Sequence, residues 1–239
     1  MQLGRKVQSH SDQKRSGRRR VLLVDDHPIV SRALADLISH EKDLEVCGIA
    51  EDGASALRQT DALKPDLVLL DITLHGRGGL ELLKDIKAQH PKQLVLLLSM
   101  HDETLYAARA VRAGASGYVM KQEATENVLI AIHKVLEGEI YLSPRMERRM
   151  MQRFAQGGSN ASLDPLEALT DRELEIFRLI GRGSGSREIA RLLCLSVKTI
   201  ESHRAHIKEK LNLKNANELV QQAIQMEKDA GSDSASTAA

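Results

Sequence analysis

Between residues 21 and 137, short apolar runs alternate with amphipathic stretches, a pattern that few architectures can accommodate. The apolar runs cover residues 21–24, 44–50, 67–70, 94–98 and 118–120. They lack a polar residue at every second position, so they predict strands that are buried on both faces. The amphipathic stretches cover residues 29–39, 53–63, 78–89, 102–112 and 125–137, and their periodicity is helical. Five such units predict an α/β fold with a doubly wound, five-stranded parallel sheet.

The rest of the chain has a different texture. A charged stretch ends in Gly and Ser residues near position 158, which predicts a linker over 138–164. Residues 165–228 show only short helical patterns and predict a second, all-α domain. The basic segment 1–20 and the low-complexity segment 229–239 predict disordered tails.

Charge is distributed unevenly between the two predicted domains. Residues 21–140 hold 12 Lys and Arg against 19 Asp and Glu, whereas residues 165–228 hold 11 against 9. This asymmetry predicts different partners for the two domains. The longest apolar runs have the length of strands, and the first twenty residues contain no apolar core, so we expect a cytoplasmic protein without membrane contact. Cys47 and Cys194 fit no metal-ligand spacing and are expected to be thiols.

Chemically matched residues directly follow four of the five predicted strands. Asp25 and Asp26 follow the first, Asp71 the third, Ser99 the fourth and Lys121 the fifth. The carboxyl ends of parallel strands form one rim, which is where open α/β sheets bind their ligands. Clustered carboxylates repel each other unless a cation joins them, and their hard oxygens suit Mg²⁺. Each residue taken singly is more often a turn residue, a cap or a solvated lysine. The combination predicts a site.

The residues of this rim resemble the receiver domain of two-component response regulators, which has a flavodoxin-like fold. The resemblance covers about residues 21–137 and is carried by these segments: Val24-Asp25-Asp26-His27-Pro28, Leu69-Leu70-Asp71-Ile72, Gly76 to Leu80, Leu98-Ser99 and Gly114 to Lys121. It implies that Asp71 is the phosphoacceptor and that Ser99 is the hydroxyl that senses the phosphoryl group. It further implies that Lys121 binds the phosphoryl group and that Tyr118 is the aromatic switch.

The same resemblance implies a set of Mg²⁺ ligands. They are the carboxylates of Asp25, Asp26 and Asp71 together with the main-chain carbonyl of Thr73. For Tyr118, a plain aromatic at the sheet edge with its hydroxyl in water is the alternative interpretation.

The segment after Asp71 departs from the family pattern. The family often has Met-Pro-Gly where this chain has Leu74-His75-Gly76, so the proline that would stiffen the loop is missing. We further hypothesise that Thr73 and His101 influence the lifetime of the phosphoryl group by orienting water.

The predicted helices after residue 165 carry clear start signals. Thr170 and Glu173 have the spacing of a capping box, Ser186 is expected to cap a short helix, and Ser196 a longer one that ends near Leu211. A helix, a short turn and a longer helix form the layout of many DNA readers. A small helical bundle that binds proteins would show the same pattern.

Detailed residues favour the DNA reader. Leu169-Thr170-Asp171-Arg172-Glu173, Glu188-Ile189-Ala190, residues 195–203 and Ile207 to Leu211 resemble the LuxR-type (NarL/FixJ-type) helix-turn-helix. The apolar spacing over 197–211 predicts that Val197, Ile200, Ile207 and Leu211 face the core. The resemblance implies that residues 197–211 form the recognition helix. It places Lys198, Thr199 and Lys208 at DNA phosphates, and Glu201, Ser202 and Ala205 at base edges. A last helix, 216–226, is expected to pack within the domain or to form a dimer face.

The sequence therefore predicts a transcription regulator rather than an enzyme. We expect a sensor histidine kinase and double-stranded DNA as partners, and a homodimer when Asp71 is phosphorylated. Two alternatives stay open at this stage. One is a Mg²⁺-dependent phosphohydrolase that uses Asp71 as a nucleophile. The other is a regulator that binds DNA irrespective of phosphorylation.

Overall fold

The strands of the N-terminal domain form one parallel sheet. The computed structural model describes residues 17–74, 78–99, 103–121, 125–155 and 165–235. The strands are β1 (Arg19–Val24), β2 (Leu44–Ala50), β3 (Leu67–Asp71), β4 (Leu94–Ser99) and β5 (Gly117–Met120). Their order is β2-β1-β3-β4-β5, and all pairs are parallel. The order reverses after β1, so the predicted doubly wound five-stranded sheet is confirmed.

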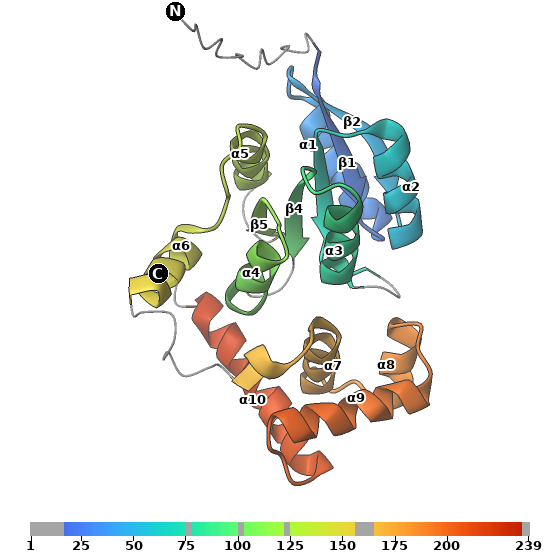
Figure 1. The fold of residues 1–239 in the computed structure, drawn as a ribbon, viewed down its shortest axis with the longest axis vertical. Coiled ribbons are helices and arrows are strands. Elements are labelled where there is room, and N and C mark those ends of the chain that lie inside the picture. The colour runs from blue at the N-terminus through green and yellow to red at the C-terminus, as the bar shows by residue number, and fades with distance from the viewer. Residues whose placement is uncertain (1–16, 75–77, 100–102, 122–124, 156–164, 236–239) are drawn as a thin grey trace, which may run out of the picture.

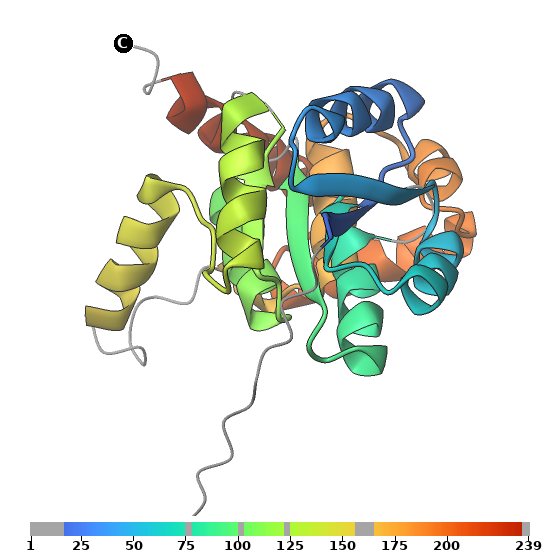
Figure 2. The same cartoon turned by 90° about the horizontal axis from the view of Figure 1, so that it is seen from above.

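Helices cover both faces of this sheet, as Figures 1 and 2 show. They are α1 (Pro28–Ser39), α2 (Gly53–Leu63), α3 (Gly79–Gln89), α4 (Glu103–Arg112) and α5 (Thr125–Leu136). Each lies within two residues of its predicted bounds. His75, Gly76 and His101 lie outside the described residues, so the expected turn and the expected role of His101 stay predictions.

Successive residues of each strand enter two separate cores. Leu22, Val68 and Leu97 pack with α2, α3 and α4 in the first core. Leu23 and Leu69, one position further along, pack with α1 and α5 in the second. Because strand side chains alternate between the faces, one fully apolar run supplies both cores.

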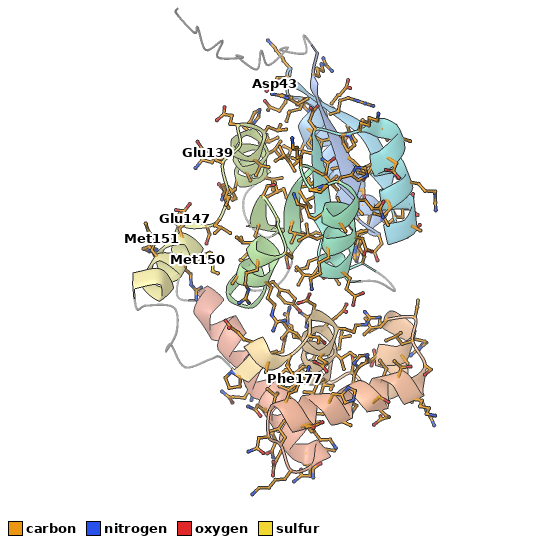
Figure 3. The ribbon with its side chains drawn as sticks, in the orientation of Figure 1. Asp43, Glu139, Glu147, Met150, Met151 and Phe177 are labelled. Atoms are coloured by element: carbon orange, nitrogen blue, oxygen red, sulfur yellow. The ribbon has the colours of Figure 1, made fainter. Side chains whose placement is uncertain are left out.

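A helix and a short helical turn connect the sheet to the second domain. Helix α6 (Pro144–Ala155) lies within the predicted linker and contacts α4, and the 3-10 helix η1 (Pro165–Ala168) follows. Figure 3 labels Met150 and Met151 on α6. Met150 packs partly against the first core, whereas Met151 is exposed.

The second domain is helical throughout its described residues, as predicted. Its helices are α7 (Asp171–Gly181), α8 (Ser186–Leu192), α9 (Val197–Lys210) and α10 (Ala216–Ala235). Phe177 of α7, labelled in Figure 3, is fully buried among them. α10 continues nine residues beyond the predicted end at 226 and so includes residues that were expected to be a disordered tail. Among the described residues, no helix combines the length and hydropathy needed to span a membrane.

The helix starts agree with the predicted caps in two of three places. Thr170 Oγ1 accepts from the Glu173 N–H while the Glu173 side chain accepts from the Thr170 N–H, which completes the capping box. The Ser196 side chain caps α9. The prediction for Ser186 was wrong, because Gly185 is the N-cap of α8 and offers no side chain.

Candidate functional sites

Two buried carboxylates and one ammonium group meet at the carboxyl end of the sheet. Because Val24 of β1 pairs with Leu70 of β3, the next residues, Asp25 and Asp71, lie side by side. Their exposed fractions are 2% and 1%. Lys121, which follows β5, places Nζ 2.7 Å from Asp25 Oδ2 and 2.7 Å from Asp71 Oδ2. The structure thus joins three of the residues that the sequence predicted for this rim.

The predicted hydroxyl and aromatic switch residues are both buried next to this rim. Ser99 ends β4 and is fully buried, and its carbonyl accepts from the Lys121 N–H at 2.7 Å. Tyr118 of β5 is also fully buried and belongs to the first core together with Tyr106 of α4. The alternative of a sheet-edge tyrosine with its hydroxyl in water is therefore wrong. The Tyr118 ring already lies inside the domain.

His27 is a residue of this site that sequence reasoning missed. Its ring Nδ1 lies 2.9 Å from Asp26 Oδ1 and 3.1 Å from Asp25 Oδ1. The main-chain N–H of His27 also donates to Asp25 Oδ1. Potential ligand atoms of Asp25, Asp26, His27 and Asp71 all lie within 4.8 Å of one another. The position of His27 directly after Asp25-Asp26 was the available signal.

Burial opposes the negative charges at this rim. It raises the pKa of the Asp71 carboxyl, although the Lys121 ammonium acts in the opposite direction. Burial also disfavours the charge on Lys121, but Asp71 and Asp25 together outweigh this effect and raise the pKa of its ammonium. Three clustered carboxylates exceed the charge of one ammonium, so their hard oxygens fit a small divalent cation such as Mg²⁺.

The residues directly after Asp71 lie close to the start of α3. The Thr73 N–H donates to Asp71 Oδ1 at 3.1 Å, and the Gly79 N–H donates to the Ile72 carbonyl at 2.9 Å. A Cβ atom added to Gly79 would lie 2.4 Å from the Asp71 carbonyl oxygen. Only glycine at position 79 allows the start of α3 to lie this close to the main chain of Asp71.

Helix α9 combines a buried and an exposed side. Ile200 and Ile207 are fully buried and anchor the helix, as predicted, whereas Val197 is 43% exposed, so its predicted core position was wrong. Of the six residues predicted to contact DNA, four are exposed and two are half-buried. The exposed ones are Lys198, Glu201, Ser202 and Ala205, and the half-buried ones are Thr199 and Lys208.

The two domains are joined by a polar clamp that the sequence did not reveal. Arg109 of α4 donates to Asp171 Oδ1 at 3.0 Å and to the carbonyls of Leu169 and Leu166 at 2.8 and 2.5 Å. Lys84 of α3 adds a 2.6 Å ion pair with Asp171 Oδ2. The clamp therefore holds the first turn of α7. Figure 1 shows α7 between the N-terminal domain and α9.

An aromatic contact and a cavity accompany the clamp. The Arg178 guanidinium of α7 lies 5.1 Å from the centre of the Tyr106 ring. A cavity of about 320 Å³ opens nearby, lined by residues of both domains that include Thr73, Leu80 and Leu193. Residues 72–74, which directly follow Asp71, and the helical domain therefore line the same cavity.

Comparisons with known proteins agree with this geometry. Residues 21–133 match the family model described as a response regulator receiver domain. Residues 167–223 match the model described as bacterial regulatory proteins of the luxR family. The first match covers the sheet and its rim, and the second covers α7 to α9 and the start of α10.

Curated relatives and solved structures extend the similarity over most of the chain. The oxygen regulatory protein NreC of Staphylococcus carnosus (strain TM300) is 34% identical over 209 residues, which are 86% of this chain and 96% of the relative. NreC of Staphylococcus aureus (strain bovine RF122 / ET3-1) is 36% identical over 210 residues, with the same shares.

Two solved structures are also similar. A LuxR-family two-component response regulator from Aurantimonas sp. SI85-9A1 is 33% identical, with a TM-score of 0.55, over 58% of this chain and 99% of that one. RcsB from Salmonella enterica serovar Typhimurium, solved bound to promoter rprA with the phosphomimetic BeF3−, shares the fold. It is 24% identical, with a TM-score of 0.60, over 86% of this chain and 98% of that one.

Proposed function

Because the chain belongs to the DNA-binding response regulators that join a receiver domain to a LuxR-type domain, we propose that phosphorylation of Asp71 controls its binding to DNA. The observation that carries this proposal is the shared ammonium of Lys121, 2.7 Å from both Asp71 and Asp25 at the rim of the sheet. A carboxylate can accept a phosphoryl group only if its charge and that of the donor are neutralised.

The transfer reaction follows from this arrangement. A carboxylate oxygen of Asp71 attacks the phosphorus of a phosphohistidine, the P–N bond breaks, and the histidine nitrogen of the sensor kinase keeps the electron pair. Lys121 stabilises the charge on the phosphoryl oxygens. Asp25, Asp26, Asp71 and the Thr73 carbonyl would hold Mg²⁺, which supplies further positive charge to the site.

The phosphoryl group then becomes a signal through Ser99. Its hydroxyl donates to a phosphoryl oxygen, which draws the end of β4 toward Asp71. Tyr118 is buried on the adjacent strand and follows this movement. Thr73 lies at the mouth of the site and influences the lifetime of the phosphoryl group by orienting water.

Helix α9 reads DNA in this proposal. Lys198, Thr199 and Lys208 contact phosphates, and the exposed residues Glu201, Ser202 and Ala205 face base edges. A phosphorylated homodimer places two such helices on a repeated site. The regulator acts in the cytoplasm, where its DNA lies. Phosphate contacts make its affinity fall as salt rises.

The phosphohydrolase alternative makes a different use of Asp71. The match of residues 167–223 to a family of regulatory proteins supports the regulator instead. Steady release of phosphate from an added phosphomonoester, at many turnovers per Asp71, would favour the hydrolase.

A small phosphodonor such as acetyl phosphate, given with Mg²⁺, tests the proposal. Mass spectrometry should detect one phosphoryl group on the wild type and none on Asp71→Asn, while Asp36→Asn on the exposed side of α1 serves as the matched control. DNA fragments recovered with the phosphorylated protein should share a sequence that those recovered with Asp71→Asn lack. Equal recovery by both proteins would favour a regulator that ignores phosphorylation.

A further inference from the structure

A second cluster of metal-ligand side chains lies between α7 and α9, away from the rim of the sheet. Glu173 comes from the first turn of α7, and His203 and His206 are one turn apart on α9. One potential ligand atom of each residue lies within 4.8 Å of the others. The three side chains therefore need only small movements to contact one ion.

Glu173 has one carboxylate oxygen that accepts hydrogen bonds and a second one that lies near His206. Its side chain is 4% exposed. Oε2 accepts from Lys210 Nζ at 2.7 Å and from the Thr170 N–H at 2.8 Å. Oε1 lies 3.9 Å from Nδ1 of His206. The hydrogen bonds to Oε2 fix the carboxylate and leave Oε1 available, as partners of metal-bound carboxylates do.

His203 supplies an independent indication. Its Nδ1 is buried and has no hydrogen-bond partner among the described residues. A buried polar atom without a partner costs free energy and calls for an explanation. Burial also lowers the pKa of the His203 ring, which is the direction that favours the neutral, metal-binding form.

We propose that Glu173, His203 and His206 bind a divalent transition-metal ion, with Zn²⁺ as the preferred ion. Two imidazoles and one carboxylate form a ligand set that Zn²⁺ uses widely in proteins, with water in the remaining position. Two cations oppose the ion. The Lys210 ammonium contacts Oε2 of the carboxylate, and its side chain is 35% exposed to water. The Arg172 guanidinium acts on His203 but is itself paired with Glu175. His206 is 60% exposed and is free to turn toward the ion.

The ion would join the recognition helix to the start of α7. That turn also holds Asp171, the residue clamped by Arg109 and Lys84 of the N-terminal domain. Zn²⁺ would therefore stiffen the packing of α9 without occupying the positions at 201, 202 and 205. The proposal does not depend on phosphorylation of Asp71.

Titration of the full chain with Co²⁺ tests this site, because Co²⁺ bound to imidazoles absorbs visible light. Saturating Mg²⁺ is kept present so that the carboxylates of the sheet rim are occupied. We expect one visible-absorbing Co²⁺ per chain that Zn²⁺ displaces, and a rise of the melting temperature with Zn²⁺. His206→Ala should weaken Co²⁺ binding about tenfold or more, whereas the surface variant His40→Ala should bind as the wild type does.

The outcomes separate cleanly. Absence of the visible band, or the same band and affinity in His206→Ala, overturns the proposal. If His206→Ala fails to fold, as judged by circular dichroism, His206→Asn replaces it under the same criterion. A band that survives in His206→Ala but disappears when His27 is replaced assigns the ion to the sheet rim and also overturns the proposal.

Discussion

Replacement of Arg109 by methionine should loosen the helical domain from the N-terminal domain. The Arg109 side chain is 11% exposed and donates to one carboxylate and two main-chain carbonyls across the interface. Methionine keeps the length and apolar stem of the side chain but removes every donor. The apolar contacts of α4 should survive, so the change isolates the polar clamp.

The size of the effect can be estimated from these hydrogen bonds. Each hydrogen bond that involves a charged group contributes about 1.5–3 kcal/mol. The three do not add fully, because one side chain makes them all and water replaces them after the domains separate. A net loss of about 2–3 kcal/mol corresponds to a roughly 30- to 150-fold fall in the ratio of docked to separated domains.

Hydrogen exchange followed by mass spectrometry measures this ratio at residues 165–175. Exchange there should accelerate in Arg109→Met, and DNA affinity should change without any phosphodonor. Arg112→Met is the matched control on the same helix, because that arginine is 61% exposed and lies 3.9 Å from Glu167. Exposed ion pairs of this kind contribute about 0–1 kcal/mol. Unchanged exchange in Arg109→Met, or equal changes in both variants, would refute the reasoning.

Three further outcomes are expected. Gly79→Ala should lower the free energy of unfolding, measured by urea denaturation, by about 1–3 kcal/mol, because the alanine Cβ would collide with the Asp71 carbonyl. Phe177→Ala should cost about 3–5 kcal/mol, and a loss below 1 kcal/mol would contradict its central position. Burial disfavours the Glu173 carboxylate, but hydrogen bonds from Lys210 and the start of α7 outweigh it and lower its pKa. The ionised carboxylate therefore stabilises the fold at pH values above the pKa that Glu173 has in the unfolded chain, and this stabilisation is lost as the pH falls through the lower pKa of the folded state. In Glu173→Gln, which has no carboxyl to protonate, the free energy of unfolding should decrease less steeply below about pH 4.

The sheet and its rim could be predicted because the rules behind them are local and topological. An unbroken apolar run such as 67–70 by itself predicts a strand that is buried on both faces. Parallel strands place their carboxyl ends at the same edge of the sheet, and this does not depend on how the helices pack. Asp25, Asp71 and Lys121 therefore met as expected. The capping box at Thr170 was predictable for the same reason, since its two partners are three residues apart.

Features that depend on tertiary contacts could not be predicted in this way. The clamp by Arg109 joins residues about sixty positions apart and leaves no periodic signal. Tyr118 is buried because α4 and the residues after α5 cover β5, which the strand itself does not reveal. Val197 lies in the first turn of α9, three residues before the buried Ile200, and is nevertheless 43% exposed.

The division of the strand residues into two cores has a consequence for dissecting the protein. The second core closes within residues 21–141, whereas the first continues from α3 and α4 into α7 and its neighbours. A fragment that ends at residue 143 would keep the α1 and α5 side intact but uncover apolar surface around Tyr106. Such a surface invites self-association. A fragment of residues 21–143 produced alone should therefore tend to self-associate through its α4 side, a surface that α7 and its neighbours share in the full chain.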